Sequence, residues 1–191
     1  MAGKENRVRI IGGQWKGRKI EFPSVDGLRP TTDPIRETLF NWLQPHLPEA
    51  NCLDLFAGSG ALGFEAASRG AAHVLMVEKD IIIMKALRTS KELIKAETVQ
   101  LMHRQATDFL NDKRKPDDVT FDVVFLDPPF KNNSLPACVK RLEESGCLSD
   151  DAVIYLECER KLDLDFIPEN WVQHRNKTTG QVAYYLYHRE S

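Results

Sequence analysis

The chain has 191 residues, of which 42% are hydrophobic and 28% are charged, and its formal net charge is -2. This length is typical of one domain, or of one domain with a small extension, that folds without disulfide or metal support. Its apolar runs are far shorter than the roughly 20 residues of a membrane-spanning helix, and no apolar stretch follows the first residues. We therefore expect a cytoplasmic protein without a signal peptide.

The spacing of cysteine and histidine predicts no metal site. Cys52, Cys138, Cys147 and Cys158 form no C-x-x-C pair, and the five histidines are scattered along the chain. Such cysteines are typical of small buried side chains or of free thiols in a reducing compartment. We therefore expect neither a structural nor a catalytic metal ion.

Charge is distributed unevenly along the chain. Residues 1–19 carry six basic side chains and one acidic side chain, a net charge of +5, so the remaining chain carries -7. A basic arm on an acidic body favours a negatively charged partner. On charge alone, a solvated terminus explains the pattern equally well.

Residues 1–48 are predicted to form a small extension, and residues 49–191 the main domain. Residues 7–22 read as two strands around Gly12-Gly13, a pair that supplies the positive φ of a tight hairpin turn. A helix then begins at Asp33-Pro34, with Asp33 as its cap. Apolar side chains recur at helical spacing as far as Leu43, which predicts a buried stripe.

The main domain alternates predicted strands with predicted helices. Strands are expected at 52–56, 74–78, 99–103, 121–126 and 153–158, and helices at 60–69, 80–96, 106–113 and 134–145. The strand at 74–78 is continuously apolar, which is typical of strands buried on both faces. The pattern predicts a doubly wound, Rossmann-like parallel α/β sheet with helices on both faces, followed by an antiparallel hairpin over 171–188.

A glycine-rich motif follows the first of these strands. It begins at Asp54, and Gly58, Gly60 and Gly63 satisfy G-x-G-x-x-G between a strand and a helix. Glycines there allow a tight turn and a close approach of a ligand to the backbone. Glu78 ends the next strand, where a carboxylate can accept hydrogen bonds from both hydroxyls of an adenosine ribose.

Asp54 favours one of two adenosine cofactors. This carboxylate would repel the pyrophosphate of a nicotinamide dinucleotide, whereas it would attract the ammonium and sulfonium groups of S-adenosylmethionine. Phe56, in the same loop, and Asp108, just past the third strand, are further candidate cofactor contacts. Asp108 could accept a hydrogen bond from the adenine amine. Stabilisation of the start of a helix by its negative charge explains the presence of this residue nearly as well.

A second motif, Asp127-Pro128-Pro129-Phe130, directly follows the buried strand at 121–126. It offers a carboxylate, fixed carbonyl acceptors and an aromatic face, which suit the exocyclic amine and the ring of a nucleobase. Two acceptors on the amine hydrogens localise the nitrogen lone pair for attack on the sulfonium methyl. Asp127 would then stabilise the developing positive charge and take the proton.

Together these motifs resemble the class I S-adenosylmethionine-dependent methyltransferases that act on exocyclic amines. The segments Arg9–Arg18 and Leu28–Asn41, the latter beginning Leu-Arg-Pro-Thr-Thr-Asp-Pro, narrow the likeness. They are similar to the RsmD family, bacterial enzymes that methylate a guanine N2 of 16S ribosomal RNA. The likeness covers about residues 7–187.

The resemblance implies a seven-stranded methyltransferase sheet, S-adenosylmethionine as cofactor and 16S ribosomal RNA of the small subunit or its assembly intermediate as partner. It also implies cofactor contacts at Asp54, Gly58, Gly60 and Glu78, and catalysis at 127–130. We expect a monomer. The basic hairpin and the following loop are expected to bind RNA through Arg7, Arg9, Lys16, Arg18, Lys19, Arg29 and Thr31.

Three other functions compete with this interpretation. One is a non-catalytic RNA-binding assembly factor with a degenerate pocket, but the intact acceptor motif at 127–130 weighs against it. A DNA adenine-N6 or cytosine-N4 methyltransferase would share the second motif, but the chain holds no large target-recognition segment. A nicotinamide-dependent oxidoreductase would share the glycine motif, but no Tyr-x-x-x-Lys pattern follows it.

Overall fold

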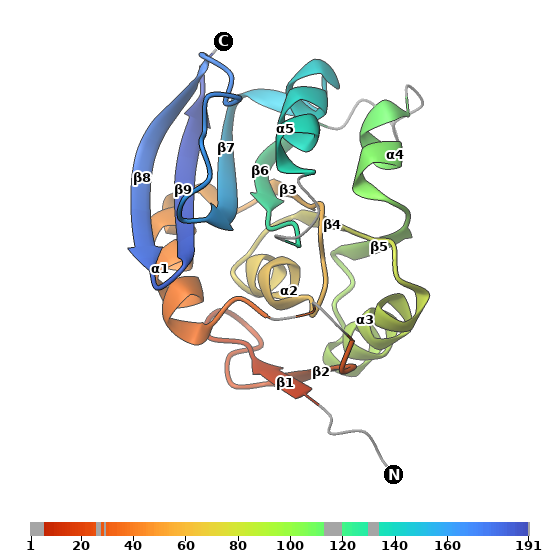
Figure 1. Ribbon diagram of the computed structural model, residues 1–191. Helices are drawn as coiled ribbons and strands as arrows, with labels where there is room; N and C mark the ends of the chain where they lie inside the picture. Colours follow the sequence, from red (N-terminus) through yellow and green to blue (C-terminus); the bar gives the residue numbers. More distant parts are fainter. Residues whose placement is uncertain (1–5, 26–27, 29, 113–119, 130–133, 191) are drawn as a thin grey trace.

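The computed structural model describes residues 6–25, 28, 30–112, 120–129 and 134–190 (Figure 1). A hairpin of β1 (Asn6–Arg9) and β2 (Lys19–Phe22) comes first, followed by α1 (Asp33–Leu43) and the short 3-10 helix η1 (Gln44–His46). Strands and helices then alternate: β3 (Asn51–Asp54), α2 (Ala61–Ser68), β4 (His73–Glu78), α3 (Ile81–Ile94), β5 (Val99–His103), α4 (Ala106–Asn111), β6 (Phe121–Leu126) and α5 (Leu135–Glu144). The chain ends with β7 (Leu148–Glu159), β8 (Trp171–Thr179) and β9 (Val182–Arg189).

The main sheet has seven strands in the order β5-β4-β3-β6-β7-β9-β8. The five strands from β3 to β7 are parallel to one another, and β9 is antiparallel to both β7 and β8. The predicted doubly wound sheet and its C-terminal hairpin are therefore confirmed. Because the chain runs outward from β3 in one direction and then returns to β6 on its other side, the switch point of the sheet lies between β3 and β6. Ligands of such folds bind at the carboxyl ends of strands beside this point.

Helices cover both faces of the sheet, as predicted (Figure 1). One apolar core contains buried residues of α1, α2 and α3 with one face of the strands, and a second contains buried residues of α4 and α5 with the other face. The strand β4 is buried from Val74 to Glu78, as its continuous apolar run predicts. The four cysteines are free and buried, and among the described residues no helix is long and apolar enough to cross a membrane.

The start of α1 differs slightly from the prediction. The helix includes Asp33, and Thr32 occupies the capping position without a side-chain cap bond. The Asp33 carboxylate instead accepts a hydrogen bond from Arg36 at 2.6 Å. Arg36 is completely buried and lies 3.6 Å from Glu65 of α2, so its charge is compensated on two sides.

The N-terminal hairpin packs against the main domain through a buried carboxylate. Glu65 of α2 is fully buried and accepts the backbone N–H groups of Ile11 and Gly12 at 2.7 and 2.8 Å. It also accepts from Arg69 at 2.7 Å. Val8, Ile10 and Ile20 of the hairpin belong to the same core as α1, α2 and α3. The hairpin thus shares its core with the sheet, while the division into units at residue 48 stays a prediction.

We expect Ile20→Ala to lower the free energy of unfolding of the whole chain by about 2–5 kcal/mol, because it empties space in a shared core. Ile20 has no exposed surface. Urea denaturation followed by circular dichroism measures the effect, and Lys19→Ala, at the exposed neighbouring position, is the control. A single transition with unchanged midpoint for Ile20→Ala would show that the hairpin is not part of the cooperative unit.

Candidate active site at the carboxyl ends of the central strands

The glycine motif forms the turn between β3 and α2. Gly58 and Gly60 have φ values of +49° and +80°, which favour glycine, and Gly60 immediately precedes α2. A Cβ atom at Gly60 would lie 2.6 Å from the ring of Phe64 and 2.8 Å from Leu87. Both the backbone conformation and the packing therefore disfavour a side chain at this position.

Asp54 ties this turn to the end of β3. Its carboxylate is only 1% exposed and accepts the backbone N–H groups of Gly63 at 3.1 Å and Phe56 at 3.4 Å. Burial raises the pKa of Asp54 to about 7, an effect that these two hydrogen bonds oppose and the charge of Glu78 increases. Asp54 therefore orders the loop in addition to any electrostatic effect that it exerts on a ligand.

Glu78 faces the same turn from the end of β4. Its two carboxylate oxygens accept the backbone N–H groups of Gly58 at 2.9 Å and Asp80 at 2.8 Å. The next carboxylate, Asp80, caps α3 by accepting from the N–H of Ile82 at 2.7 Å. The structure thus brings Asp54, Glu78 and the glycines together, as the motif predicts.

Two other predicted cofactor contacts, Phe56 and Asp108, lie outside this cluster of carboxylates and glycines. Phe56 lies in the loop and is half-buried. Asp108 lies in the first turn of α4, after β5, and its side chain is exposed. The position of Asp108 at the carboxyl end of the sheet is compatible with an adenine contact, and its role stays a prediction.

The second motif lies at the end of β6, the strand next to β3. Asp127 is half-buried and its Oδ2 atom accepts a hydrogen bond from the hydroxyl of Thr31 at 3.0 Å. Burial, followed by the charge of Glu157, raises the pKa of Asp127 well above its usual range, and the Thr31 bond opposes the rise. Pro128 is buried and Pro129 is exposed, while Phe130 lies outside the described residues.

Thr31 and Glu157 extend the candidate site beyond the sequence motifs. Thr31 is predicted as an RNA contact, but its side chain is buried against Asp127. Glu157, on β7, was not predicted to be a site residue, because it lies within the largely apolar strand segment Val153–Cys158. Asp54, Asp127 and Glu157 therefore lie at the carboxyl ends of three neighbouring strands, β3, β6 and β7.

The predicted RNA contacts of the N-terminal hairpin are exposed, and several of them have partners within the protein. Arg7 pairs with Glu21 at 2.9 Å, and the Arg9 guanidinium lies 3.8 Å from Asp33. Arg18 donates to the carbonyl of Ile94 at 3.5 Å. Lys16 and Lys19 are exposed, and Arg29 lies outside the described residues.

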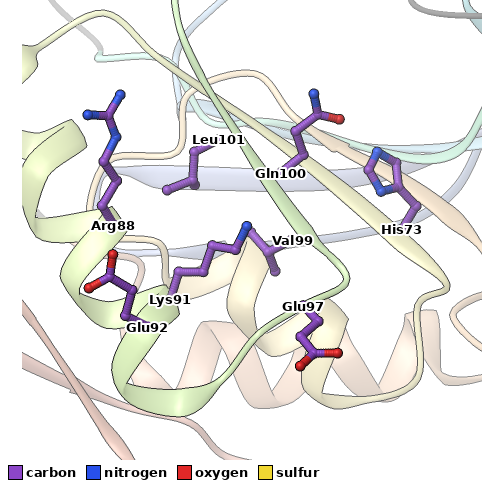
Figure 2. Close-up of a pocket in the computed structure, with 8 residues that line it drawn as sticks. All are labelled: His73, Arg88, Lys91, Glu92, Glu97, Val99, Gln100 and Leu101. Carbon is purple, nitrogen blue, oxygen red and sulfur yellow. The ribbon is translucent and has the colours of Figure 1, made fainter.

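A separate hollow of about 630 Å³ lies between α3 and β5 (Figure 2). It is lined by both acidic and basic side chains, among them Arg88, Lys91 and Glu97. His73 and Val99, which also line it, are the first residues of β4 and β5. The hollow is thus at the opposite end of these strands from Glu78, and it is distinct from the candidate site.

Comparisons with known proteins place the chain in a family. The family model described as "Conserved hypothetical protein 95" matches residues 8–188. The chain is 48% identical over 185 residues to "Ribosomal RNA small subunit methyltransferase D" of Escherichia coli (strain K12), covering 97% of this chain and 91% of that protein. A solved structure titled "Putative methyltransferase yhhF from Escherichia coli" has a TM-score of 0.88 and 48% identity, covering 97% of this chain and 99% of that one.

A more distant solved structure shares the fold. It is titled "T. Thermophilus 16S rRNA N2 G1207 methyltransferase (RsmC) in complex with AdoMet and Guanosine" and has a TM-score of 0.74. Its sequence is 21% identical, and the match covers 98% of this chain and 50% of that one.

We expect Gly60→Ala to destabilise the chain more than Gly146→Ala. Both glycines have positive φ, which costs an alanine about 1–2 kcal/mol. Only at Gly60 does the added Cβ also meet neighbouring atoms, which adds about 1–3 kcal/mol of overpacking, whereas Gly146 has open space around it. Unfolding free energies of the two variants measure the difference, and equal losses would contradict the tight packing of the loop.

Proposed function

The chain belongs to the RsmD family of ribosomal RNA methyltransferases, and on this basis we propose that it methylates the exocyclic N2 amine of a guanine in 16S ribosomal RNA. S-adenosylmethionine is the methyl donor. The proposed substrate is the small ribosomal subunit or an assembly intermediate of it, which would be met in the cytoplasm by a monomeric enzyme. The names of the relatives favour this function over DNA methylation or nicotinamide-dependent oxidation.

One observation carries the proposal: a carboxylate acceptor for an amine lies beside a turn suited to an adenosine cofactor. Asp127 follows β6. Asp54 is the last residue of β3, the strand with which β6 pairs, and the glycine turn follows it. A base whose amine binds Asp127 would therefore lie at the end of β6, next to a cofactor bound at the end of β3. This arrangement holds the two reactants close together, which is the main requirement of a direct transfer.

The proposed reaction needs no covalent intermediate with the enzyme. The N2 nitrogen attacks the methyl carbon, a new N–C bond forms, and the C–S bond breaks with its electron pair left on sulfur as a neutral thioether. The nitrogen becomes positively charged and then transfers one of its protons to the Asp127 carboxylate. Asp127 thus stabilises the charge that develops at the amine and accepts its proton.

Glu78 is proposed to bind the ribose hydroxyls of the cofactor. Its carboxylate already accepts two backbone N–H groups, one of them from Gly58 of the glycine turn. These bonds fix the orientation of the carboxylate at the end of β4, which lowers the cost of ordering it when the ligand binds. A carboxylate accepting from two hydroxyls would also discriminate against a 2′-phosphorylated cofactor.

Transfer of a labelled methyl group tests the proposed activity directly. Small subunits from a strain that lacks this methyltransferase are incubated with the protein and labelled S-adenosylmethionine, and the RNA is digested to nucleosides. We expect label in N2-methylguanosine of 16S RNA. Label in N6-methyladenosine or in a methylated cytidine, or no transfer to any RNA, would contradict the proposal.

Asp127→Ala should lower the rate of methyl transfer, whereas Glu78→Ala should weaken cofactor binding. Loss of Asp127 should lower the single-turnover rate by about 10²–10³ while leaving the affinity for S-adenosylhomocysteine nearly unchanged. Loss of Glu78 should weaken that affinity by about 1.5–3 kcal/mol for each ribose hydrogen bond, before relaxation of the loop. Calorimetry and labelled transfer on the same two variants measure both quantities, and a Glu78 variant with wild-type affinity would refute the ribose contact.

The exposed lysines of the N-terminal hairpin are proposed to contact RNA phosphates. For the double variant Lys16→Ala and Lys19→Ala, we expect the salt dependence of RNA binding to weaken by about 0.7–0.9 in log-log slope for each phosphate that is no longer bound. Filter binding at several salt concentrations measures this slope. Lys140→Ala on α5 is the control, because Lys140 is 74% exposed and α5 packs on the other face of the sheet. Equal slopes for all three proteins would show that the hairpin lysines do not contact the backbone of the RNA.

A further inference from the structure

A buried polar pair on β7 has no role in the reaction as described above. Tyr155 has no exposed surface, and Glu157 is 6% exposed. The Tyr155 hydroxyl donates a hydrogen bond to the Oε2 atom of Glu157 at 2.6 Å. A carboxylate is costly to bury even when it is hydrogen-bonded, so its presence in the continuously buried stretch 152–158 of β7 indicates a role other than packing.

The register of the sheet places Glu157 beside Asp127. Leu126 of β6 pairs with Leu156 of β7, so the next residues on the two strands are Asp127 and Glu157. Adjacent strands lie about 4.8 Å apart, and residues two apart along a strand share a face. Asp127 and Glu157 thus continue the face on which the rings of Phe125 and Tyr155 lie 6.4 Å apart.

The groups that act on Asp127 come from three neighbouring parts of the structure. Glu157 and Tyr155 face it from β7 and Asp54 from β3, while Thr31 donates to it from the segment before α1. Tyr184 of β9 packs behind Tyr155, with ring centroids 6.3 Å apart.

The charged groups that act on Asp127 are therefore two carboxylates, Glu157 and Asp54. Burial raises the pKa of Glu157 as well as that of Asp127, and the hydrogen bond from Tyr155 opposes the rise at Glu157. A pair of carboxylates in this setting binds a proton more readily than either would alone.

We propose that Glu157 is a positioning residue that acts through Asp127, its negative charge making the Asp127 carboxylate a stronger acceptor for the proton of the methylated amine. Tyr155 holds Glu157 in place by its hydrogen bond. When the N–C bond has formed and the C–S bond has broken, the amine proton moves to Asp127. The uptake of this proton also removes the repulsion between the two carboxylates, which favours the step. This inference rests on the proposed methyl transfer.

The test compares Glu157→Gln with Glu159→Gln in the full-length protein. The first substitution keeps an acceptor oxygen for the Tyr155 hydroxyl but removes the charge, whereas Glu159 is an exposed residue of the same strand. Single-turnover transfer from labelled S-adenosylmethionine to unmethylated small subunits is measured as a function of pH. For Glu157→Gln, we expect the acidic limb of the profile to move down by about one pH unit and the plateau rate to fall. The limb of Glu159→Gln should match that of the wild type.

The outcomes separate this inference from the proposed function. Wild-type protein that transfers no methyl group to the subunits refutes the proposed function. Wild-type transfer with an acidic limb that does not move in Glu157→Gln refutes the role of Glu157 alone. Tyr155→Phe should move the limb in the same direction by a smaller amount, because without the hydrogen bond Glu157 is ionised to a lesser extent.

A second measurement needs no activity. A carboxyl group whose pKa is higher in the folded than in the unfolded chain binds extra protons when folded, so its contribution to stability is present at low pH and is lost as pH rises. We expect the unfolding free energy of the wild type to decrease with pH more steeply than that of Glu157→Gln across the neutral range. Identical slopes for wild type, Glu157→Gln and Glu159→Gln would overturn the inference even if the variant were inactive.

Discussion

The parallel pairing of β4, β3, β6 and β7 is the constraint on which the site depends. It brings Glu78, Asp54, Asp127 and Glu157, which are far apart in the sequence, to the carboxyl ends of four consecutive strands. Parallel strands need long crossovers, and α2 and α3 provide those between β3, β4 and β5. The same helices form the core that holds the glycine turn and the N-terminal hairpin in place.

Gathering carboxylates at one edge of a sheet opposes stability and favours the proposed chemistry. Burial raises the pKa of Asp54 to about 7 and also raises the pKa values of Asp127 and Glu157, and neighbouring carboxylates add to the rise at Asp54 and Asp127. Backbone N–H groups and the hydroxyls of Thr31 and Tyr155 compensate part of this cost. A site that holds excess negative charge attracts a cationic cofactor and accepts the proton that transfer releases.

Local sequence patterns predicted most of the fold and the two motifs, because each depends on residues close together in the chain. The glycine turn and Asp127 could be assigned in this way, and apolar runs such as Val74–Val77 marked the central strands. Interactions between distant segments could not be predicted. Thr31 and Asp127 are 96 residues apart in the sequence and come into contact only in the folded chain. Glu65 has the sequence context of a solvated helix residue, and only the structure shows that Ile11 and Gly12 donate to it.

A crystal structure of the protein with S-adenosylhomocysteine and guanosine would show directly where the acceptor amine lies. We expect the N2 nitrogen of guanosine within about 2.6–3.2 Å of an Asp127 carboxylate oxygen. We also expect the thioether sulfur beside the glycine turn, with the ribose hydroxyls on Glu78. Guanosine bound away from the end of β6, or bound there with its amine turned away from Asp127, would contradict the proposed role of Asp127.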